Sequence, residues 1–330
     1  MSTQEKHDLA EYVRILARGK NASRHMTLDE AHYTMSNMLK GNYRPEQLGA
    51  IFMLMRVLEE DEQEIAGFAK AISEYLPQDL DADLLWASYA GKRRQPFWCL
   101  LSALLLKDMG YKILFHGSLS HTEGRIYLHE VFEQFNLPQL TQASEMRHHS
   151  LAYLPCSAIN PQLQEWLLLK SVLGVRSPIN TVLKTISPQH VPSVQGIFHP
   201  NYKAMHCGAA ALLNHDALVI KGEGGEFEVN PERKCVAQYC FNGEQGEIVI
   251  QNDQSLFEDK PKDTSPQHLS DVWHGRLHSE YAEQAVVKTA ALALCAIEKS
   301  SDYDAAFDRC KTAWDARSKD HNTVTDQLTL

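Results

Sequence analysis

No apolar run in this 330-residue sequence is long enough to cross a bilayer. The longest, Phe97 to Leu106, is far shorter than the roughly 20 residues that a transmembrane helix needs. The first ten residues are polar and charged and lack the apolar core of a signal peptide. The seven cysteines show no CxxC spacing, and their odd number argues against a disulfide framework. We therefore expect a cytoplasmic protein with reduced thiols and no membrane contact.

The sequence also lacks the common short catalytic and nucleotide-binding motifs. It has no GxGxxG fingerprint, no P-loop, no GxSxG and no HExxH, so dinucleotide, nucleophile-elbow and zinc-protease chemistry find no support. A net charge of −10 argues against nucleic-acid binding by the whole surface. The charge is unevenly distributed, however, because residues 84–125 carry six cations and two acids, and residues 165–203 carry four cations and one acid. An acidic protein with one basic face fits this distribution.

The first 80 residues predict a helical subdomain. Thr27 to Glu30 has the form of a capping box, Pro45 suits the first turn of a second helix, and Asp61 to Glu64 repeats the start signal for a third. A later helical stretch of about residues 163–185 is expected to join this bundle. The chain is long enough for two domains, and we assign the α/β domain to residues 81–162 and 186–330.

After Leu80, short apolar strands alternate with helices, which is typical of an α/β domain with a mainly parallel central sheet. A hairpin is expected to turn at Asn242-Gly243, and residues 253–268 read as an exposed linker. The expected strands are 84–87, 112–115, 151–155, 193–198 and 217–221, and the expected helices are 97–109, 125–135, 202–213 and 279–298.

The loop of residues 86–95 stands at the corner between the first expected strand and a helix. Phosphates usually bind at such corners, because backbone N–H groups and the helix dipole favour an anion there. This loop has one glycine, Gly91, and three consecutive cations, Lys92, Arg93 and Arg94. Cations oppose the dipole at a helix N-terminus, and an anionic ligand would remove the conflict. The alternative is a solvated loop without a ligand.

Further cations follow in the second basic region. Lys170, Arg176 and Lys184 are one to two helical turns apart, although Pro178 is expected to break the helix between them. Lys203 lies at the start of a helix after Pro200. Structural salt bridges are the alternative for these residues, but Glu165 is the one acid close to them in the sequence.

Several short motifs, taken in order, resemble the TrpD-like proteins of glycosyltransferase family 3, the anthranilate phosphoribosyltransferases, over nearly the whole chain. They are Leu16 to Asn21, Gln47 to Ala50, Glu64 to Gly67, His116-Gly117, Leu173 to Arg176 followed by Asn180, and Lys221 to Gly225. The resemblance implies a helical subdomain and a larger α/β domain of the nucleoside phosphorylase and class IV phosphoribosyltransferase type.

The sequence differs from this family at the residues that bind the family's phosphoribosyl donor. There a GTGGD loop grips the diphosphate of phosphoribosyl pyrophosphate, and an Asp-Glu pair holds magnesium. The loop matches Ala87 to Gly91 here, without the close-approach glycines or the acid, and Glu228 alone remains of the metal pair. We therefore expect no catalytic residue, metal or cofactor, and a remnant donor site at Ser88, Gly91, His116, Gly117, Asn180 and Glu228.

The loop from Ser88 to Gln95 is most similar to the YbiB-type branch of TrpD-like proteins. That resemblance implies a homodimer joined through the helical subdomains that binds single- or double-stranded nucleic acid with little sequence preference. The alternatives are a transferase that acts on a different phosphoribosyl donor with magnesium, and a scaffold that binds another protein. On the first hypothesis the nucleic-acid-binding residues are Lys92, Arg93, Arg94, Lys170, Arg176, Lys184 and Lys203.

Overall fold

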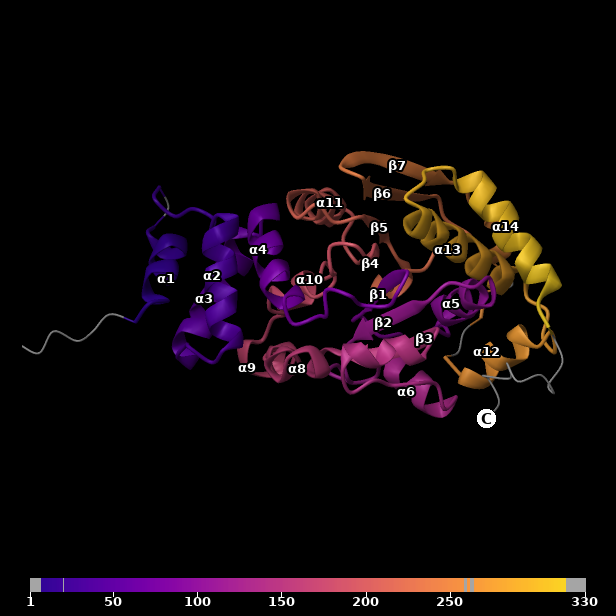
Figure 1. Ribbon diagram of the computed structural model, residues 1–330, viewed down its shortest axis with the longest axis horizontal. Coiled ribbons are helices and arrows are strands. Elements are labelled where there is room, and N and C mark those ends of the chain that lie inside the picture. Colours follow the sequence, from indigo (N-terminus) through magenta and orange to yellow (C-terminus); the bar gives the residue numbers. More distant parts are fainter. Residues whose placement is uncertain (1–6, 20, 258–259, 262–263, 319–330) are drawn as a thin grey trace, which may run out of the picture.

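The computed structural model describes residues 7–19, 21–257, 260–261 and 264–318. The molecule is elongated, with the N-terminal helices at one end and the sheet with its covering helices forming the larger body (Figure 1). None of the helices in these ranges combines the length and the apolar character that a membrane span requires.

The helical end begins with four helices whose starts follow local sequence signals. Thr27 caps α2 and Asp61 caps α4, and in both cases the third helical residue, Glu30 or Glu64, completes a capping box as predicted. Pro45 occupies the first turn of α3, also as predicted. The bounds are α1 (Ala10–Ala17), α2 (Leu28–Leu39), α3 (Pro45–Leu58) and α4 (Glu62–Ser73).

Residues 161–182 form three short helices that pack on this end of the molecule. They are α8 (Pro161–Leu168), α9 (Lys170–Leu173) and α10 (Ile179–Val182). The ring of Trp166 lies 5.8 Å from that of Phe52 on α3 and 6.2 Å from that of Tyr43. Helix α9 ends at Gly174, which has a left-handed φ of 76°, so the chain turns before it reaches Pro178.

A seven-stranded sheet with the order β3-β2-β1-β4-β5-β6-β7 forms the centre of the body. Strands β1 to β5 are parallel, and β6 and β7 add an antiparallel hairpin that turns at Asn242-Gly243. The predicted α/β class with a mainly parallel sheet is thereby confirmed. The strands are β1 (Leu84–Ser88), β2 (Ile113–Gly117), β3 (Leu151–Pro155), β4 (Ser193–Ile197), β5 (Ala217–Lys221), β6 (Cys235–Phe241) and β7 (Glu244–Ile250).

Helices cover both faces of the sheet. Helices α5, α13 and α14 share one core with the sheet, and the first helical bundle shares a second core with the other face. The linker prediction for residues 253–268 is wrong at Leu256, which is buried. The remaining elements are α5 (Trp98–Asp108), α6 (Leu128–Gln134), η1 (Ala143–His148), α7 (Cys156–Ile159), α11 (Tyr202–Leu212), η2 (Glu223–Gly225), η3 (Gln254–Phe257), α12 (Pro266–Trp273), α13 (Glu280–Glu298) and α14 (Tyr303–Ala316).

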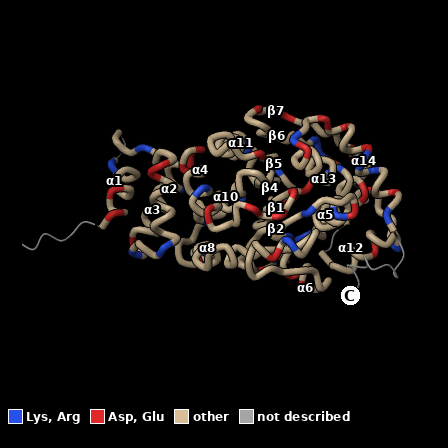
Figure 2. Tube along the Cα trace, in the orientation of Figure 1, with Lys and Arg blue, Asp and Glu red and all other residues tan. Residues whose placement is uncertain are grey.

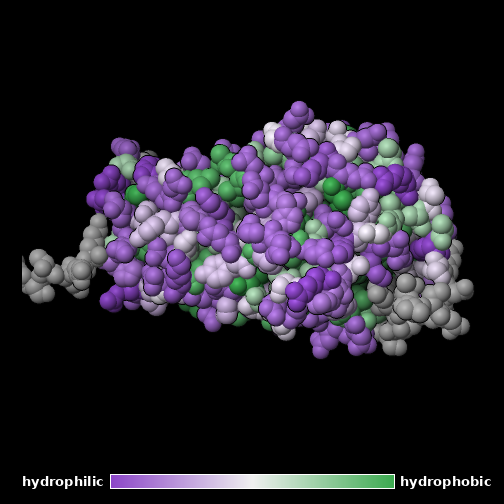
Figure 3. All heavy atoms as spheres, viewed as in Figure 1, coloured by the Kyte–Doolittle hydropathy of each residue, from purple (hydrophilic) through white to green (hydrophobic). Residues whose placement is uncertain are grey.

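The views in Figures 2 and 3 show no large area of one charge sign and no large apolar area. Acidic and basic residues are interspersed along both the helical end and the body (Figure 2). The face seen in Figure 3 is mainly hydrophilic, and its hydrophobic areas are small and separate.

The strand order places a ligand site at a definite position. The chain runs from β1 outwards to β2 and β3, and then returns to the other side of β1 to form β4 and β5. In open α/β sheets, ligands bind beyond the carboxyl ends of the strands at this reversal. The loops after Ser88, Gly117, Ile197 and Lys221 all meet at this edge.

Candidate nucleic-acid interface

The loop after β1 already holds an anion, and that anion is a side chain of the same protein. The backbone N–H groups of Ala90 and Gly91 donate to Oε1 of Glu226 at 2.8 and 2.7 Å. Gly91 has a φ of 67°, which turns the backbone so that both groups reach the carboxylate. Glu226 is buried, so it fills the position where a phosphate would meet these amides.

A second carboxylate lies beside the N-terminus of α5. Oε1 of Glu228 accepts from the N–H of Cys99 at 3.1 Å, and its other oxygen accepts from Nζ of Lys92. Glu228 and Lys92 are both buried, with 1% and 3% of their surfaces exposed. Burial raises the pKa of Glu228, and the charge of Lys92 acts in the opposite direction. Lys92 and Glu228 lie within ion-pair distance of each other and are both buried.

This ion pair corrects the prediction for Lys92. Its ammonium group points inwards to Glu228, so it does not face a ligand at the surface. The cation that seemed to oppose the dipole of α5 has an internal anionic partner. The sequence did not reveal this partner, because Lys92 and Glu228 are 136 positions apart in the chain.

His116 and Gly117 keep the shape of the loop after β2. Burial lowers the pKa of His116 to about 3, so the ring is neutral, and its Nδ1 lies 2.9 Å from the hydroxyl of Tyr89. A Cβ atom at Gly117 would lie 2.1 Å from the carbonyl oxygen of Ser88. Ser88 itself is buried at the end of β1. His116 and Gly117 therefore have structural roles in this chain, and Ser88 is buried beside them.

Three arginines gather outside the filled loop, and we name them the arginine cluster: Arg93, Arg125 and Arg176. Burial lowers the pKa of Arg125, and the nearby charges of Arg176 and Arg93 lower it further. Arg125 donates to the carbonyl oxygens of Ala90 and Gly91 at 2.7 and 2.8 Å. Within the described ranges, none of the three forms an ion pair with a carboxylate. The charge of buried Glu226 offsets part of this repulsion at Arg125, and the remaining excess of positive charge favours an anionic ligand.

Arg176 also lines a cavity of about 130 Å³ beyond the carboxyl end of β4, which we name the carboxyl-end cleft. Lys184, two residues after α10, also lines it, and its Nζ donates to the carbonyl oxygen of Gly196 at 2.5 Å. Burial lowers the pKa of Lys184 to about 8, and the charge of Arg176 adds to this effect. The other lining residues are Arg56, Ser177, Asn180, Thr181, Ile197, Phe198, His199, Tyr202 and His206.

Beyond the loop that follows β4 lies a second cavity of about 240 Å³, which we name the basic pocket. Four cations line it: Lys203, Lys221, Arg233 and Lys234. Lys203 donates to the carbonyl oxygen of Val236 at 2.9 Å, and the other three are exposed. Glu223 is the carboxylate in the lining, and it accepts from Asn230 at 2.8 Å.

The structure brings together some predicted cations and separates others. Arg93 and Arg176 lie in the arginine cluster, Lys184 and Asn180 line the carboxyl-end cleft, and Arg94 is exposed beside the loop. Lys170 is exposed on α9 and lines neither cavity.

Sequence reasoning missed five further cations at this edge. The position of Lys221 at the end of a parallel strand was a usable signal, because that end faces the site. The positions of the others depend on the fold of distant loops. The missed residues are Arg56, Arg125, Lys221, Arg233 and Lys234.

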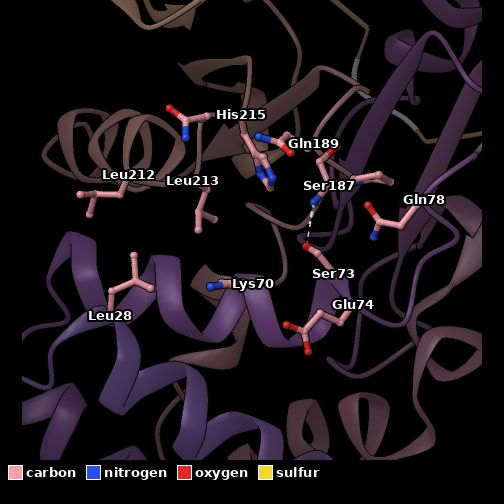
Figure 4. A pocket seen from close by; sticks show the side chains of 12 residues that line it. Leu28, Lys70, Ser73, Glu74, Gln78, Ser187, Gln189, Leu212, Leu213 and His215 are labelled. Atoms are coloured by element: carbon pink, nitrogen blue, oxygen red, sulfur yellow. Dashed lines mark hydrogen bonds between the residues drawn. The ribbon is translucent and has the colours of Figure 1, made fainter.

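A larger cavity of about 350 Å³ lies at the opposite end of α11, where Lys70, Ser73, Ser187 and His215 point into the space (Figure 4). Its walls include the residues just before β4 and β5, so it borders the amino ends of the strands. Ligand sites of open α/β sheets lie at the other edge. We therefore take the carboxyl-end cleft as the candidate site.

His25, Asp61 and Glu64 form a group whose ligand atoms could hold a metal ion. Glu64 is already satisfied there, because it accepts from the N–H of Met26 at 3.0 Å and lies 3.0 Å from Nδ1 of His25. With the N–H of Asp61 it also completes the cap of α4. These contacts explain the group as the attachment of the loop before α2 to α4.

Comparison with known proteins shows the same architecture. Residues 10–75 match the helical bundle domain of the glycosyl transferase family. The protein YbiB of Escherichia coli is 25% identical over 238 residues, which cover 68% of this chain and 74% of YbiB. An anthranilate phosphoribosyltransferase of Actinobacillus pleuropneumoniae is 24% identical over 230 residues, which cover 66% of this chain and 68% of that protein.

The anthranilate phosphoribosyltransferase from Saccharomyces cerevisiae, solved in complex with phosphoribosyl pyrophosphate and magnesium, superposes with a TM-score of 0.73. It is 14% identical, and the match covers 98% of this chain and 96% of that one. The chain therefore has the TrpD-like fold, as the motifs predicted.

A magnesium–diphosphate group does not fit the residues present here. Each oxygen of Glu228 already has a partner, Lys92 or the N–H of Cys99, and Glu226 takes the loop amides. A hard cation needs several oxygen ligands, and the ammonium group of Lys92 already pairs with the carboxylate of Glu228.

Proposed function

We propose that this chain is a non-catalytic, homodimeric binder of nucleic acid with little sequence preference, built on a TrpD-like fold that has lost its donor site. The observation that carries this proposal is the contrast at the carboxyl edge of the sheet. Glu226 accepts the hydrogen bonds of the backbone amides in the loop after β1, whereas the three arginines beside it form no ion pair among the described residues and are offset only in part, at Arg125, by the charge of Glu226.

Contacts made by arginine and lysine side chains favour a polyanion, rather than a small phosphorylated substrate, as the ligand. Arginine and lysine side chains contact phosphates of a backbone without reading the bases, and such contacts give affinity without sequence preference. The cations also extend over two cavities, the carboxyl-end cleft and the basic pocket. The protein's net charge of −10 confines binding to this edge.

Apolar side chains at the helical end support the homodimer. Val57 on α3 is 80% exposed and Val172 on α9 is 78% exposed, and Leu168 and Val175 lie close to Val172 in the chain and are also exposed. Exposed valines on two neighbouring elements are typical of a surface that a partner covers. Light scattering should give the mass of two chains, and Val172→Asp should give one; a single-chain mass for the unmodified protein would contradict this part of the proposal.

Fluorescence anisotropy with labelled oligonucleotides tests nucleic-acid binding. The variant Arg93→Ala/Arg94→Ala/Arg176→Ala should weaken binding to different sequences equally, because it removes phosphate contacts. It should also lower the slope of log affinity against log salt by about 0.7 for each cation that contacts a single strand. The matched control, Lys40→Ala/Lys70→Ala/Arg147→Ala, removes three exposed cations elsewhere and should bind as the unmodified protein does.

The proposal fails if the unmodified protein binds no single- or double-stranded oligonucleotide at low salt. It also fails if the control variant weakens binding as much as the arginine variant, because the effect would then reflect net charge alone.

A further inference from the structure

The loop after β4 separates the two basic cavities and carries an unusually exposed aromatic ring. Phe198 is 56% exposed directly after the strand, and it lines the carboxyl-end cleft. Pro200 and Lys203, a few residues further, line the basic pocket. Phe198 therefore stands between two groups of cations. A single exposed apolar residue is common on a surface, but this one belongs to a cationic site.

Two further aromatic groups follow the Phe198 ring along the chain. The ring of His199 lies 5.1 Å from that of Phe198 at an angle of 76°, and the ring of Tyr202 lies 6.5 Å beyond His199. Tyr202 is fixed in turn, because its hydroxyl accepts from Arg56 at 3.4 Å and donates to Glu60 at 3.5 Å. The ring of Phe198 lies near Gly225, since a Cβ atom there would be 3.6 Å from it, and more than half of the residue remains exposed.

Charge surrounds the ring on both sides of the loop. In the carboxyl-end cleft, Arg56 and Arg176 are cations without carboxylate ion pairs in the described ranges. In the basic pocket, Lys221, Arg233 and Lys234 are exposed around one lining carboxylate, Glu223. Helix α11 also begins here, with no acidic residue in its first turn.

We infer that this loop is a stacking site for an unpaired base, with successive phosphates of one strand bound in the carboxyl-end cleft and in the basic pocket. The inference rests on the proposed function and specifies its ligand as single-stranded nucleic acid. Aromatic rings flanked by cations bind single strands, because every base has a stacking face and every nucleotide a phosphate. A duplex offers the phosphates alone, since its base faces are stacked inside.

If this loop stacks a base, Phe198 and the cations of the basic pocket should contribute to binding in different ways. Phe198 should distinguish single strands from duplexes, whereas the cations of the basic pocket should contribute to both through charge. Loss of the Phe198 ring should therefore reduce the preference for single strands over duplexes. Loss of the cations should reduce the affinity for both and weaken its salt dependence.

Anisotropy with 20-nucleotide oligo(dT), oligo(rU) and a DNA duplex of equal length tests this. Phe198→Ala should weaken binding of both single strands by about 5-fold to 100-fold and leave duplex affinity within about 2-fold. Lys221→Ala/Arg233→Ala/Lys234→Ala should weaken all three ligands and reduce the salt slope. Leu212→Ala is the matched control, since Leu212 is an exposed apolar residue at the other end of α11.

The variant Phe198→Trp provides a second readout that does not depend on a loss of binding. A stacked base should quench its additional tryptophan fluorescence with single strands and leave it unchanged with the duplex. The inference is overturned if Phe198→Ala binds single strands normally, or if it weakens single strands and duplex equally. In both cases the unmodified protein still binds, so the proposed function stands; absence of all binding by the unmodified protein would remove the function itself.

Discussion

The buried ion pair between Lys92 and Glu228 gives the sharpest test of the proposal that this chain has lost the donor site. Lys92→Met removes the cation and leaves the carboxylate of Glu228, which is 1% exposed, without a counter-charge. Breaking a buried pair by removing one partner costs about 3–5 kcal/mol. Because the bond from the N–H of Cys99 remains, we expect the lower part of this range.

Thermal melting followed by fluorescence measures the effect. Lys92→Met should lower the melting temperature strongly, whereas Lys92→Met/Glu228→Gln should regain most of the loss because neither buried group is then charged. The control Lys112→Met breaks an exposed pair with Asp81, whose nitrogen and oxygen lie 2.6 Å apart, and should cost less than about 1 kcal/mol.

The pH dependence adds an independent check. Burial raises the pKa of Glu228 above its ordinary value, and removal of Lys92 should raise it further. Below that raised pKa the folded variant carries a neutral carboxyl group, so the penalty of Lys92→Met should shrink as the pH falls from 7 to 5. A variant as stable as the unmodified protein at pH 7, or a penalty that grows on acidification, would refute the reasoning.

Two further predictions concern the cleft and the sheet edge. Burial lowers the pKa of Lys184 to about 8, so the affinity for oligo(dT) should fall as the pH rises from 7 to 9. The variant Lys184→Met should lose this pH dependence. Equal pH profiles of the variant and the unmodified protein would contradict the prediction. Gly117→Ala places a Cβ against the carbonyl oxygen of Ser88 and should lower the melting temperature, whereas Gly49→Ala on α3 meets no atom within 4 Å and should not; equal melting temperatures would contradict the structural role of Gly117.

Local signals predicted most of the helical end and the sheet. The caps at Thr27 and Asp61 and the proline at position 45 act within one helical turn, so a short stretch of sequence contains the whole signal. Helix α14 was missed because its buried side, with Ala306, Cys310 and Trp314, is narrow within a polar segment. The hairpin turn at Asn242-Gly243 was predicted because both residues adopt positive φ readily.

The candidate site was less predictable because its main interactions join distant segments. The sequence indicated an anion at the loop after β1, but it could not show that Glu226, 136 positions from Ala90, supplies it. The same separation concealed the partner of Lys92. Arg93 and Arg176 were named from their sequence context, whereas their proximity to Arg125 depends on how three loops meet.

Calorimetry with phosphoribosyl pyrophosphate and magnesium tests the central claim most directly, because the claim is that this protein's own carboxylates and Lys92 occupy the donor site. The account predicts no heat of binding at millimolar ligand. Saturable, magnesium-dependent binding or turnover of this donor by the unmodified protein would contradict it.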